Sequence, residues 1–308
     1  MAQGPAAPRR VGYLSAFNRA TADSLLGLVR LELEKLGWTE RRNLVLLEPR
    51  TAEGVNERLP ALAAELVAQS PDLIIVQSIP AARALVKATK SIPVVMMGVG
   101  TPVELGIVAD YRRPGGNVTG SAYLADEFMR KSLQYLKEAA PRLRSVAVFS
   151  NPTNEATPAM VKQMRADAIA SGIRAQFVEV SSKDDFEPAF AAIRGASTES
   201  ILLPPEPLIN ANKEAIGAFA QAHRLPLAVV GSRRALPDGG LFSYGPHPLE
   251  FARVTANFVD RILTGAIPGD LPIERPTRFS LVVNLRVARA LGLTIPQSML
   301  LAADEVIQ

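Results

Sequence analysis

The sequence predicts an α/β protein with two Rossmann-like lobes, each a parallel sheet flanked by helices. Short aliphatic runs alternate with longer stretches of helical period, which is typical of βαβ units. The pattern also occurs twice: Val11-Gly-Tyr-Leu-Ser15 returns as Val146-Ala-Val-Phe-Ser150. In both copies a glycine follows that serine by 22 residues (37 − 15 and 172 − 150). A chain of 308 residues, 48% of them apolar, also exceeds what one core usually encloses.

The first copy predicts strands over residues 11–15, 73–76 and 92–98. Between residues 21 and 36, apolar positions recur at helical spacing, so we expect a helix that Thr21 or Asp23 caps and Gly37 ends. Its predicted core face consists of Leu25, Leu28, Val29, Leu33 and Leu36. Two further helices are predicted over residues 55–69 and 81–90.

The second copy repeats this order, with strands near residues 146–150, 200–203 and 225–231. A helix over residues 157–171 is predicted to turn Met160, Met164 and Ile169 inward and to end at Gly172. The other predicted helices span residues 127–139, 186–194 and 211–223. Each strand is thus followed by a crossover helix, as right-handed βαβ units require.

Three segments interrupt the alternation and predict crossings between the lobes. These crossings are expected near residues 120–126, 243–248 and 272–280, and they predict a three-segment hinge of parallel strands. The expected N-terminal lobe contains residues 11–122 and 246–273. The expected C-terminal lobe contains residues 123–245 and 274–308, with an Asn284-capped helix that Gly292 closes.

Composition excludes several classes of function. The absence of cysteine removes disulfides, thiolate metal sites and cysteine nucleophiles, and two histidines leave few acid–base dyads. No G-x-S-x-G, Walker A, H-E-x-x-H or dinucleotide-binding G-x-G-x-x-G motif occurs, so we expect no catalysis, no cofactor and no metal site. The 34 basic residues are scattered and the net charge is only +4, which argues against nucleic acid as a partner.

The chain contains no apolar run long enough to span a bilayer. Its first ten residues are polar, and Ala2-Gln3 is typical of the residues just after a signal-peptide cleavage site, with Met1 added as a start codon. We therefore expect an exported, periplasmic protein whose signal peptide has been removed. A cytoplasmic protein with a flexible N-terminus is the alternative.

Candidate ligand-binding residues lie in polar loops at the carboxyl ends of the strands, where open α/β sheets bind ligands. Ser78 precedes a helix whose N–H groups at Ile79 to Ala81 favour a carboxylate, although a plain N-cap is equally compatible. Glu206 suits an ammonium group, or is an exposed loop residue. The predicted set is Ser15, Phe17, Asn18, Ser78, Ile79, Pro80, Ala81, Gly100, Thr101, Tyr123, Asn151, Glu206, Ser232 and Tyr244, with Phe17, Tyr123 and Tyr244 covering an apolar ligand body.

Several motifs carry a family resemblance over residues 10–308. They include the segments 58–66, 113–120, 151–152, 239–246, 270–277 and 290–296. In these the chain resembles the ABC-transporter substrate-binding proteins of the tryptophan-binding (TrpX-like) type, which have the type I periplasmic binding fold. The resemblance implies a monomer that captures a small solute by hinge closure and delivers it to an inner-membrane ABC permease.

Two positions depart from the family pattern, since Ile79 and Thr101 replace a small polar residue and an aspartate. The departures make an apolar or aromatic carboxylate without an amino group a competitor to an amino acid as the ligand. A ligand-sensing regulatory module of the same fold remains an alternative function. A two-lobed enzyme such as a racemase is a third, for which the expected paired cysteines are missing.

Overall fold

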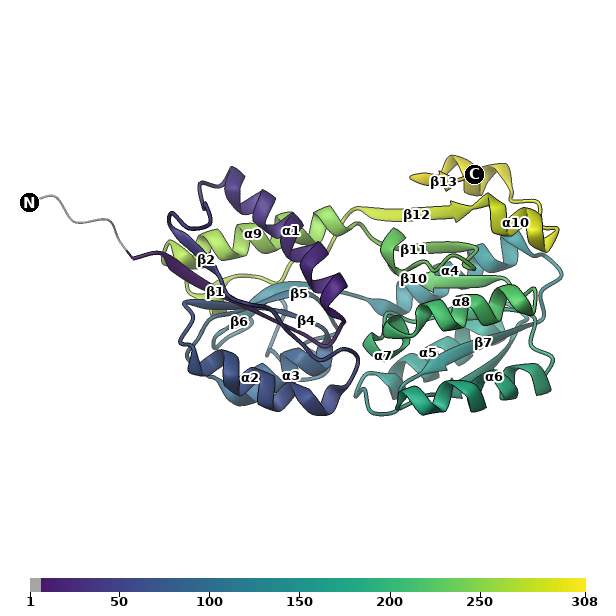
Figure 1. Ribbon diagram of the computed structural model, residues 1–308, viewed down its shortest axis with the longest axis horizontal. Helices are drawn as coiled ribbons and strands as arrows, with labels where there is room; N and C mark the ends of the chain where they lie inside the picture. Colours follow the sequence, from purple (N-terminus) through teal and green to yellow (C-terminus); the bar gives the residue numbers. More distant parts are fainter. Residues whose placement is uncertain (1–6) are drawn as a thin grey trace, which may run out of the picture. The chain divides into compact units, whose positions relative to one another are not determined.

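The structure is a computed structural model that describes residues 7–308, and its internal contacts divide the chain into two compact units (Figure 1). Unit 1 contains the chain up to Tyr123 and the segment Pro248–Thr277, and unit 2 contains Leu124–His247 and Arg278–Gln308. From the sequence we expected the changes of lobe at residues 122, 246 and 273. Within residues 7–308, no helix combines the length and the hydropathy that crossing a bilayer requires.

Unit 1 is built on a parallel sheet in the order β2-β1-β4-β5-β6, with β3 also paired to β1. Its strands are β1 (Arg9–Ser15), β2 (Leu44–Leu46), β3 (Arg50–Thr51), β4 (Leu73–Gln77), β5 (Val94–Gly100) and β6 (Val118–Tyr123). Its helices are α1 (Arg19–Lys35), α2 (Leu59–Ala68), α3 (Ile79–Ala88) and α9 (Pro248–Leu263), with short 3-10 turns η1 (Asn56–Arg58) and η4 (Pro268–Asp270).

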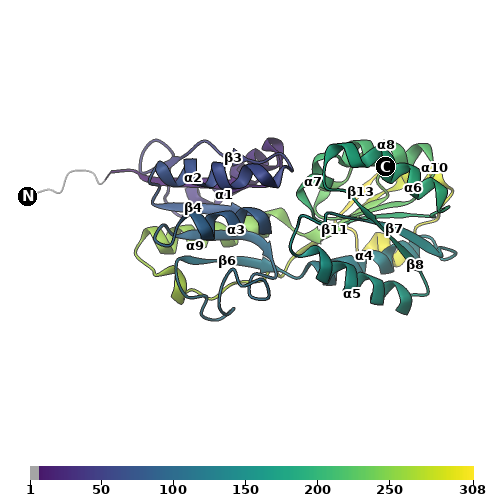
Figure 2. The same cartoon turned by 90° about the horizontal axis from the view of Figure 1, so that it is seen from below.

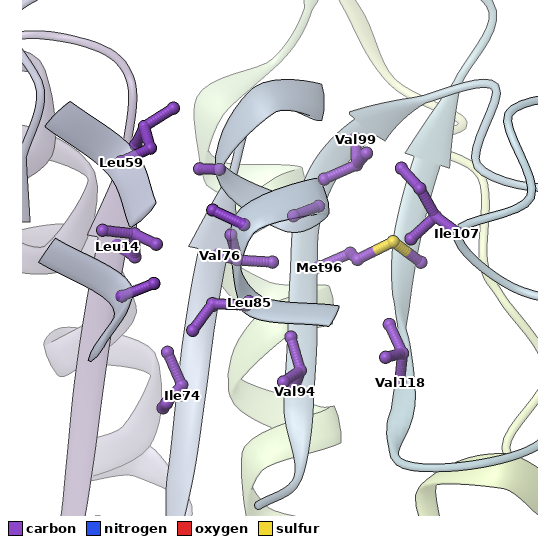
Figure 3. Close-up of a cluster of buried hydrophobic side chains, with 14 of the residues drawn as sticks. Leu14, Leu59, Ile74, Val76, Leu85, Val94, Met96, Val99, Ile107 and Val118 are labelled. Atoms are coloured by element: carbon purple, nitrogen blue, oxygen red, sulfur yellow. The ribbon is translucent and has the colours of Figure 1, made fainter. Parts of the chain in front are cut away.

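Alternate residues of the unit 1 strands enter two separate cores. Leu14, Ile74 and Val76 pack under α2 and α3, as Figure 3 shows. Their neighbours Tyr13, Ile75 and others face the opposite side, where α1 and α9 cover the sheet (Figure 1). This burial of both sheet faces explains why the strands have continuous apolar runs rather than an alternating pattern.

Unit 2 contains a larger sheet in the order β13-β12-β11-β10-β9-β7-β8. The strands are β7 (Ser145–Ser150), β8 (Arg174–Glu179), β9 (Ile201–Leu203), β10 (Leu227–Val230), β11 (Phe242–Pro246), β12 (Phe279–Asn284) and β13 (Glu305–Ile307). The helices are α4 (Ala125–Ala139), α5 (Thr157–Ala170), α6 (Phe186–Gly195), α7 (Pro207–Ala211), α8 (Lys213–Ala222), α10 (Leu285–Leu291) and α11 (Gln297–Leu301), with 3-10 turns η2 (Lys183–Asp185) and η3 (Arg233–Ala235). Figure 2 shows α6 and α8 on one face of this sheet and α4 and α5 on the other.

The internal repeat is also visible in the order of the strands. Numbered along the chain without the two-residue β3, the first five strands of each unit lie in the order 2-1-3-4-5. The direction of winding therefore reverses between β1 and β4 in unit 1, and between β7 and β9 in unit 2. The two α/β sheets flanked by helices confirm the predicted fold class.

Some local predictions were wrong. Helix α1 begins at Arg19, and its cap is the side chain of Asn18, which accepts a hydrogen bond from the N–H of Thr21. Leu36 is 41% exposed and Ile169 is 73% exposed, so neither belongs to a core face. Strand β12 runs antiparallel to β11, and the strands at the crossings are therefore not all parallel. The Asn284 cap and the left-handed Gly292 at the ends of α10 are confirmed.

Candidate functional site

Each unit has candidate ligand residues at the carboxyl ends of four neighbouring strands, and all of them except Gln77 belong to the predicted set. Half-site 1, in unit 1, consists of Ser15, Gln77, Ser78, Thr101 and Tyr123 at the ends of β1, β4, β5 and β6. Half-site 2, in unit 2, consists of Asn151, Glu206, Ser232 and Tyr244, at or just after the ends of β7, β9, β10 and β11. In both units the set includes the switch point of the sheet, where ligands of open α/β folds bind.

Ser78 has an unusual backbone conformation. Its φ of 88° and ψ of 153° fall in a region that is accessible almost only to glycine, and such a residue costs on the order of 1–3 kcal/mol. The side chain is 8% exposed, and its Oγ accepts a hydrogen bond of 3.4 Å from the N–H of Ala81 at the start of α3. Ser78 is thus the predicted N-cap, with its hydroxyl hydrogen still available to donate.

The number of free backbone donors at the start of α3 is smaller than we expected. Pro80 has no N–H, and the N–H of Ala81 is used by Ser78. The N–H of Ile79 has no partner among residues 7–308. The predicted group of N–H donors from Ile79 to Ala81 therefore reduces to one backbone donor, which the Ser78 hydroxyl supplements.

Gln77 is a candidate that the sequence-based set omitted. Its Oε1 accepts hydrogen bonds from the Tyr13 hydroxyl at 2.6 Å and from the Ser15 hydroxyl at 3.2 Å. The Ser15 Oγ also accepts from the N–H of Phe17, so the fully buried Ser15 is used within unit 1. These contacts orient Gln77, whose Nε2 makes no hydrogen bond among the described residues and remains a donor. The signal in the sequence was a polar residue ending an aliphatic strand directly before Ser78.

Thr101 and Tyr123 extend half-site 1 along β5 and β6. Gly100 is paired in register with Tyr123, and Thr101 has a left-handed φ of 40° and a hydroxyl without a partner among residues 7–308. A Cβ on Gly100 would lie 3.4 Å from the Ile79 side chain, so the loops after β4 and β5 are close together. Burial raises the pKa of Tyr123, whose ring also lies 6.2 Å from that of Phe251.

Phe17 and Asn18 have different roles in the loop after β1. The Oδ1 of Asn18 caps α1 at 2.9 Å and is therefore occupied by the protein itself. Phe17 is half-buried, and its ring makes no aromatic contact within the described part of the chain. It is the side chain of unit 1 that best fits the predicted role of covering an apolar ligand body.

Glu206 is a buried carboxyl group in half-site 2. Only 4% exposed, it accepts hydrogen bonds from Asn151 Nδ2 at 2.9 Å and from the N–H of Ile209 at 3.0 Å. No basic side chain forms an ion pair with it among residues 7–308. Burial raises the pKa of its carboxyl group, and the two hydrogen bonds oppose that shift. The alternative of an exposed loop glutamate is therefore wrong.

Asn151 positions Glu206 rather than presenting free polar groups. Its Oδ1 accepts hydrogen bonds from the N–H and the hydroxyl of Thr153, at 3.0 and 2.8 Å. Its backbone carbonyl accepts from the Thr157 hydroxyl. With 1% exposure, Asn151 fixes the carboxylate orientation from within unit 2.

Tyr244 belongs to an aromatic cluster of unit 2. Its ring centroid lies 5.7 Å from Phe128, 5.4 Å from Tyr135 and 6.4 Å from Phe279. This packing accounts for much of its burial, so at most one edge of the ring is available to a ligand. Ser232, in contrast, is half-buried and its hydroxyl has no partner within residues 7–308.

The two half-sites differ in their chemistry. The groups left free in half-site 1 are the Ile79 N–H, the Gln77 amide and two hydroxyls, which can all donate to an anion. Half-site 2 instead contains a carboxylate that can accept from a cation. Within residues 7–308 no group of three or more metal-ligating side chains occurs, and neither half-site contains a nucleophile paired with a base.

Comparison with known proteins places the chain in a family. The family described as ABC transporter substrate binding protein matches residues 28–307, and the chain belongs to it. The chain is also 23% identical to a protein of Clostridioides difficile named tyrosine-binding protein, over 85% of this chain and 74% of that protein. The predicted resemblance and the capture of a small solute, as in this family, are thereby confirmed.

Solved structures agree with this assignment. A Streptococcus pneumoniae ABC domain in complex with L-Trp superposes with a TM-score of 0.88 at 23% identity, covering 98% of this chain and all of that one (100%). A conserved domain protein of Vibrio cholerae superposes with a TM-score of 0.89 at 26% identity, covering 97% of this chain and 99% of that one. These similarities show the type I periplasmic binding fold. A protein of this family binds its substrate for an ABC transporter and works with a permease.

Proposed function

We propose that the protein binds one small carboxylate-bearing solute with an apolar or aromatic body, using both half-sites together. The observation that carries this proposal is the asymmetry between them: the free groups of half-site 1 can all donate, and half-site 2 offers a buried carboxyl group that has no cationic partner among residues 7–308. The solute carboxylate accepts from the Ser78 hydroxyl, the Ile79 N–H and Gln77. An ammonium group on the solute pairs with Glu206, which favours an amino acid over an acid without an amino group.

The relatives support this class of solute. The matching C. difficile protein is named for tyrosine, and the S. pneumoniae structure contains L-Trp. A solute-binding protein of Rhodopseudomonas palustris with benzoate has the same fold at a TM-score of 0.61 and 14% identity. All three ligands combine a carboxylate with an aromatic ring, and Phe17 and one edge of Tyr244 provide the apolar surface for such a ring.

The remaining parts of the function are also proposals. We infer that the protein acts in the periplasm as an exported monomer, that it binds without converting its solute, and that it delivers the solute to an inner-membrane ABC permease. Bending at the three segments around residues 123, 247 and 277 lets both half-sites hold one solute. The lack of a nucleophile–base pair in either half-site supports a role without catalysis.

Calorimetry with L-tryptophan, L-tyrosine and benzoate tests the proposal. We expect one solute per chain, and a loss of roughly tenfold or more in affinity in Ser78→Ala, since a charge-assisted hydrogen bond contributes about 1.5–3 kcal/mol. Native mass spectrometry of the protein as purified complements this by identifying a retained molecule. Binding of every ligand by Ser78→Ala as tightly as by the parent protein would contradict the carboxylate assignment.

A further inference from the structure

Unit 2 contains a cavity of about 480 Å³ at the opposite end of its sheet from half-site 2. Half-site 2 follows the carboxyl ends of β9 and β10, whereas Leu225 in the cavity wall precedes the start of β10. The walls come from the end of α8, the turn before β11 and the helix α10, which Figures 1 and 2 show at the same end of unit 2. A cavity of this size is large enough for a small organic ligand.

The walls of the cavity are held in place by backbone contacts. The turn that contains Asp238 packs so closely on α8 that a Cβ at Gly239 would collide with the carbonyl oxygen of Gly217. On the other side, Asn284 caps α10 and also donates to the carbonyl of Asp238 at 3.5 Å. Both helices are therefore fixed to one turn, and these contacts define the shape of the cavity.

The lining combines an apolar surface with two exposed arginines. Leu225, Val287 and Leu291 contribute apolar area. Arg224 and Arg286 are exposed at the rim, and neither forms an ion pair or a side-chain hydrogen bond among residues 7–308. Asp238 also lines the cavity and likewise has no ion-pair partner in the described chain. The two positive charges and the one negative charge give the lining a net positive charge of one, which favours a monoanionic ligand.

We propose that this cavity is a second ligand site, which takes a small monoanionic carboxylate with an apolar body. The guanidinium groups of Arg224 and Arg286 bind the carboxylate, because arginine presents paired donors that match its two oxygens. The apolar part lies against Leu225, Val287 and Leu291. The cavity is independent of half-site 2 because it lies at the opposite end of the strands of the same sheet. The two sites share no residue.

Arg224 offers a variant that separates binding from folding. It has a left-handed φ of 54° directly after His223, the C-cap of α8, at the position where helices usually have glycine. Arg224→Gly removes the guanidinium group and also relieves this backbone conformation. We expect a melting temperature at or above that of the parent protein, together with weaker binding at the cavity.

The experiment is a titration of the complete chain with benzoate, followed by backbone amide chemical shifts in NMR. We expect saturable shifts at Leu225, Gly239 and Val287, and a roughly tenfold or greater loss of this binding in Arg286→Gln. Arg289→Gln, an exposed arginine on the same helix outside the cavity, is the matched control and should bind as the parent does. Inorganic phosphate, which has no apolar part, should bind more weakly.

Three results would overturn the proposal. The first is benzoate shifts confined to residues of the two half-sites, with none at the cavity. The second is an equal loss of benzoate affinity at the cavity in Arg286→Gln and in Arg289→Gln, which would indicate only a diffuse attraction of anions. The third is phosphate binding as tightly as benzoate. Ser78→Ala should leave the cavity shifts unchanged, so that failure of the solute site is distinguishable from failure of this one.

Discussion

The side-chain amide of Asn151 donates a hydrogen bond of 2.9 Å to the carboxylate of Glu206, and both side chains are almost fully buried. The two residues follow β7 and β9, the neighbouring strands at which the winding of unit 2 reverses. Asn151 is held in turn by Thr153, so the position of the carboxylate is fixed by unit 2 alone. A fixed, buried carboxylate without a cationic side chain is suited to bind a cation from a ligand.

Glu206 should make the stability of the protein depend on pH. Burial raises the pKa of this carboxyl group, so the folded chain holds its proton to a higher pH than the unfolded chain does. Over that window the folded state binds more protons, and the free energy of unfolding falls as pH rises. Urea denaturation between about pH 4 and about pH 8 should show this fall in the parent protein and a smaller one in Glu206→Gln. Parallel pH profiles for the two proteins would contradict the prediction.

Ser78 should respond differently to alanine and to glycine. Ser78→Ala loses the cap of α3 and keeps the strained backbone, so we expect a loss of about 1 kcal/mol in stability. Ser78→Gly relieves the strain and should be at least as stable as the parent. Both variants lack the hydroxyl, and both should bind the solute roughly tenfold more weakly. If calorimetry shows that Ser78→Gly keeps full affinity, the hydroxyl is not a ligand contact.

Tyr13 should affect the affinity for the solute indirectly, through its hydrogen bond to Gln77. Gln77→Leu removes a donor and should weaken solute binding about fivefold. In a protein that already carries Tyr13→Phe, the same change should reduce the affinity less, because Gln77 has then lost the hydrogen bond that orients it. Tyr111→Phe, which loses a surface hydrogen bond to Glu104, is the control and should not change affinity. Strictly additive effects of the Tyr13 and Gln77 changes in calorimetry would refute the coupling.

Gly98 should not tolerate a side chain. It has a left-handed φ of 63°, and a Cβ there would lie 2.8 Å from the ring of Phe251. We expect Gly98→Ala to lower the free energy of unfolding by about 1–3 kcal/mol, and Phe251→Leu to restore part of it. Gly27→Ala adds the same methyl group inside α1, where it would meet no atom within 4 Å other than the backbone of its own helix and its chain neighbours, and should stabilise instead. Equal denaturation midpoints for the two alanine variants would contradict this account.

The fold was predictable because helices and strands follow the spacing of apolar residues, and this spacing can be read directly from the sequence. The repeat of Val11–Ser15 as Val146–Ser150 predicted two similar lobes, and both sheets have the same strand order. The direction of β12 was not predictable, since an apolar run has the same pattern in either direction. The start of α1 was missed because Asn18 caps the helix before its apolar spacing begins.

The candidate site was predictable in its location but not in the use of each side chain. The sequence placed Ser15, Ser78, Asn151 and Glu206 at or just after the carboxyl ends of strands, where the structure has them. Whether such a polar group faces a ligand or its own backbone depends on turns of a few residues. Ser15 and Asn151 are used within their own units, and this cannot be inferred from residue type or spacing.

We propose that the two half-sites hold the two charged ends of one solute. Calorimetry with L-tryptophan and with indolepropionate, which lacks only the amino group, tests it on the parent protein and on Glu206→Gln. We predict that the parent prefers L-tryptophan roughly tenfold or more and that Glu206→Gln loses this preference. The same preference in both proteins, or no binding of either compound by the parent, would contradict the account.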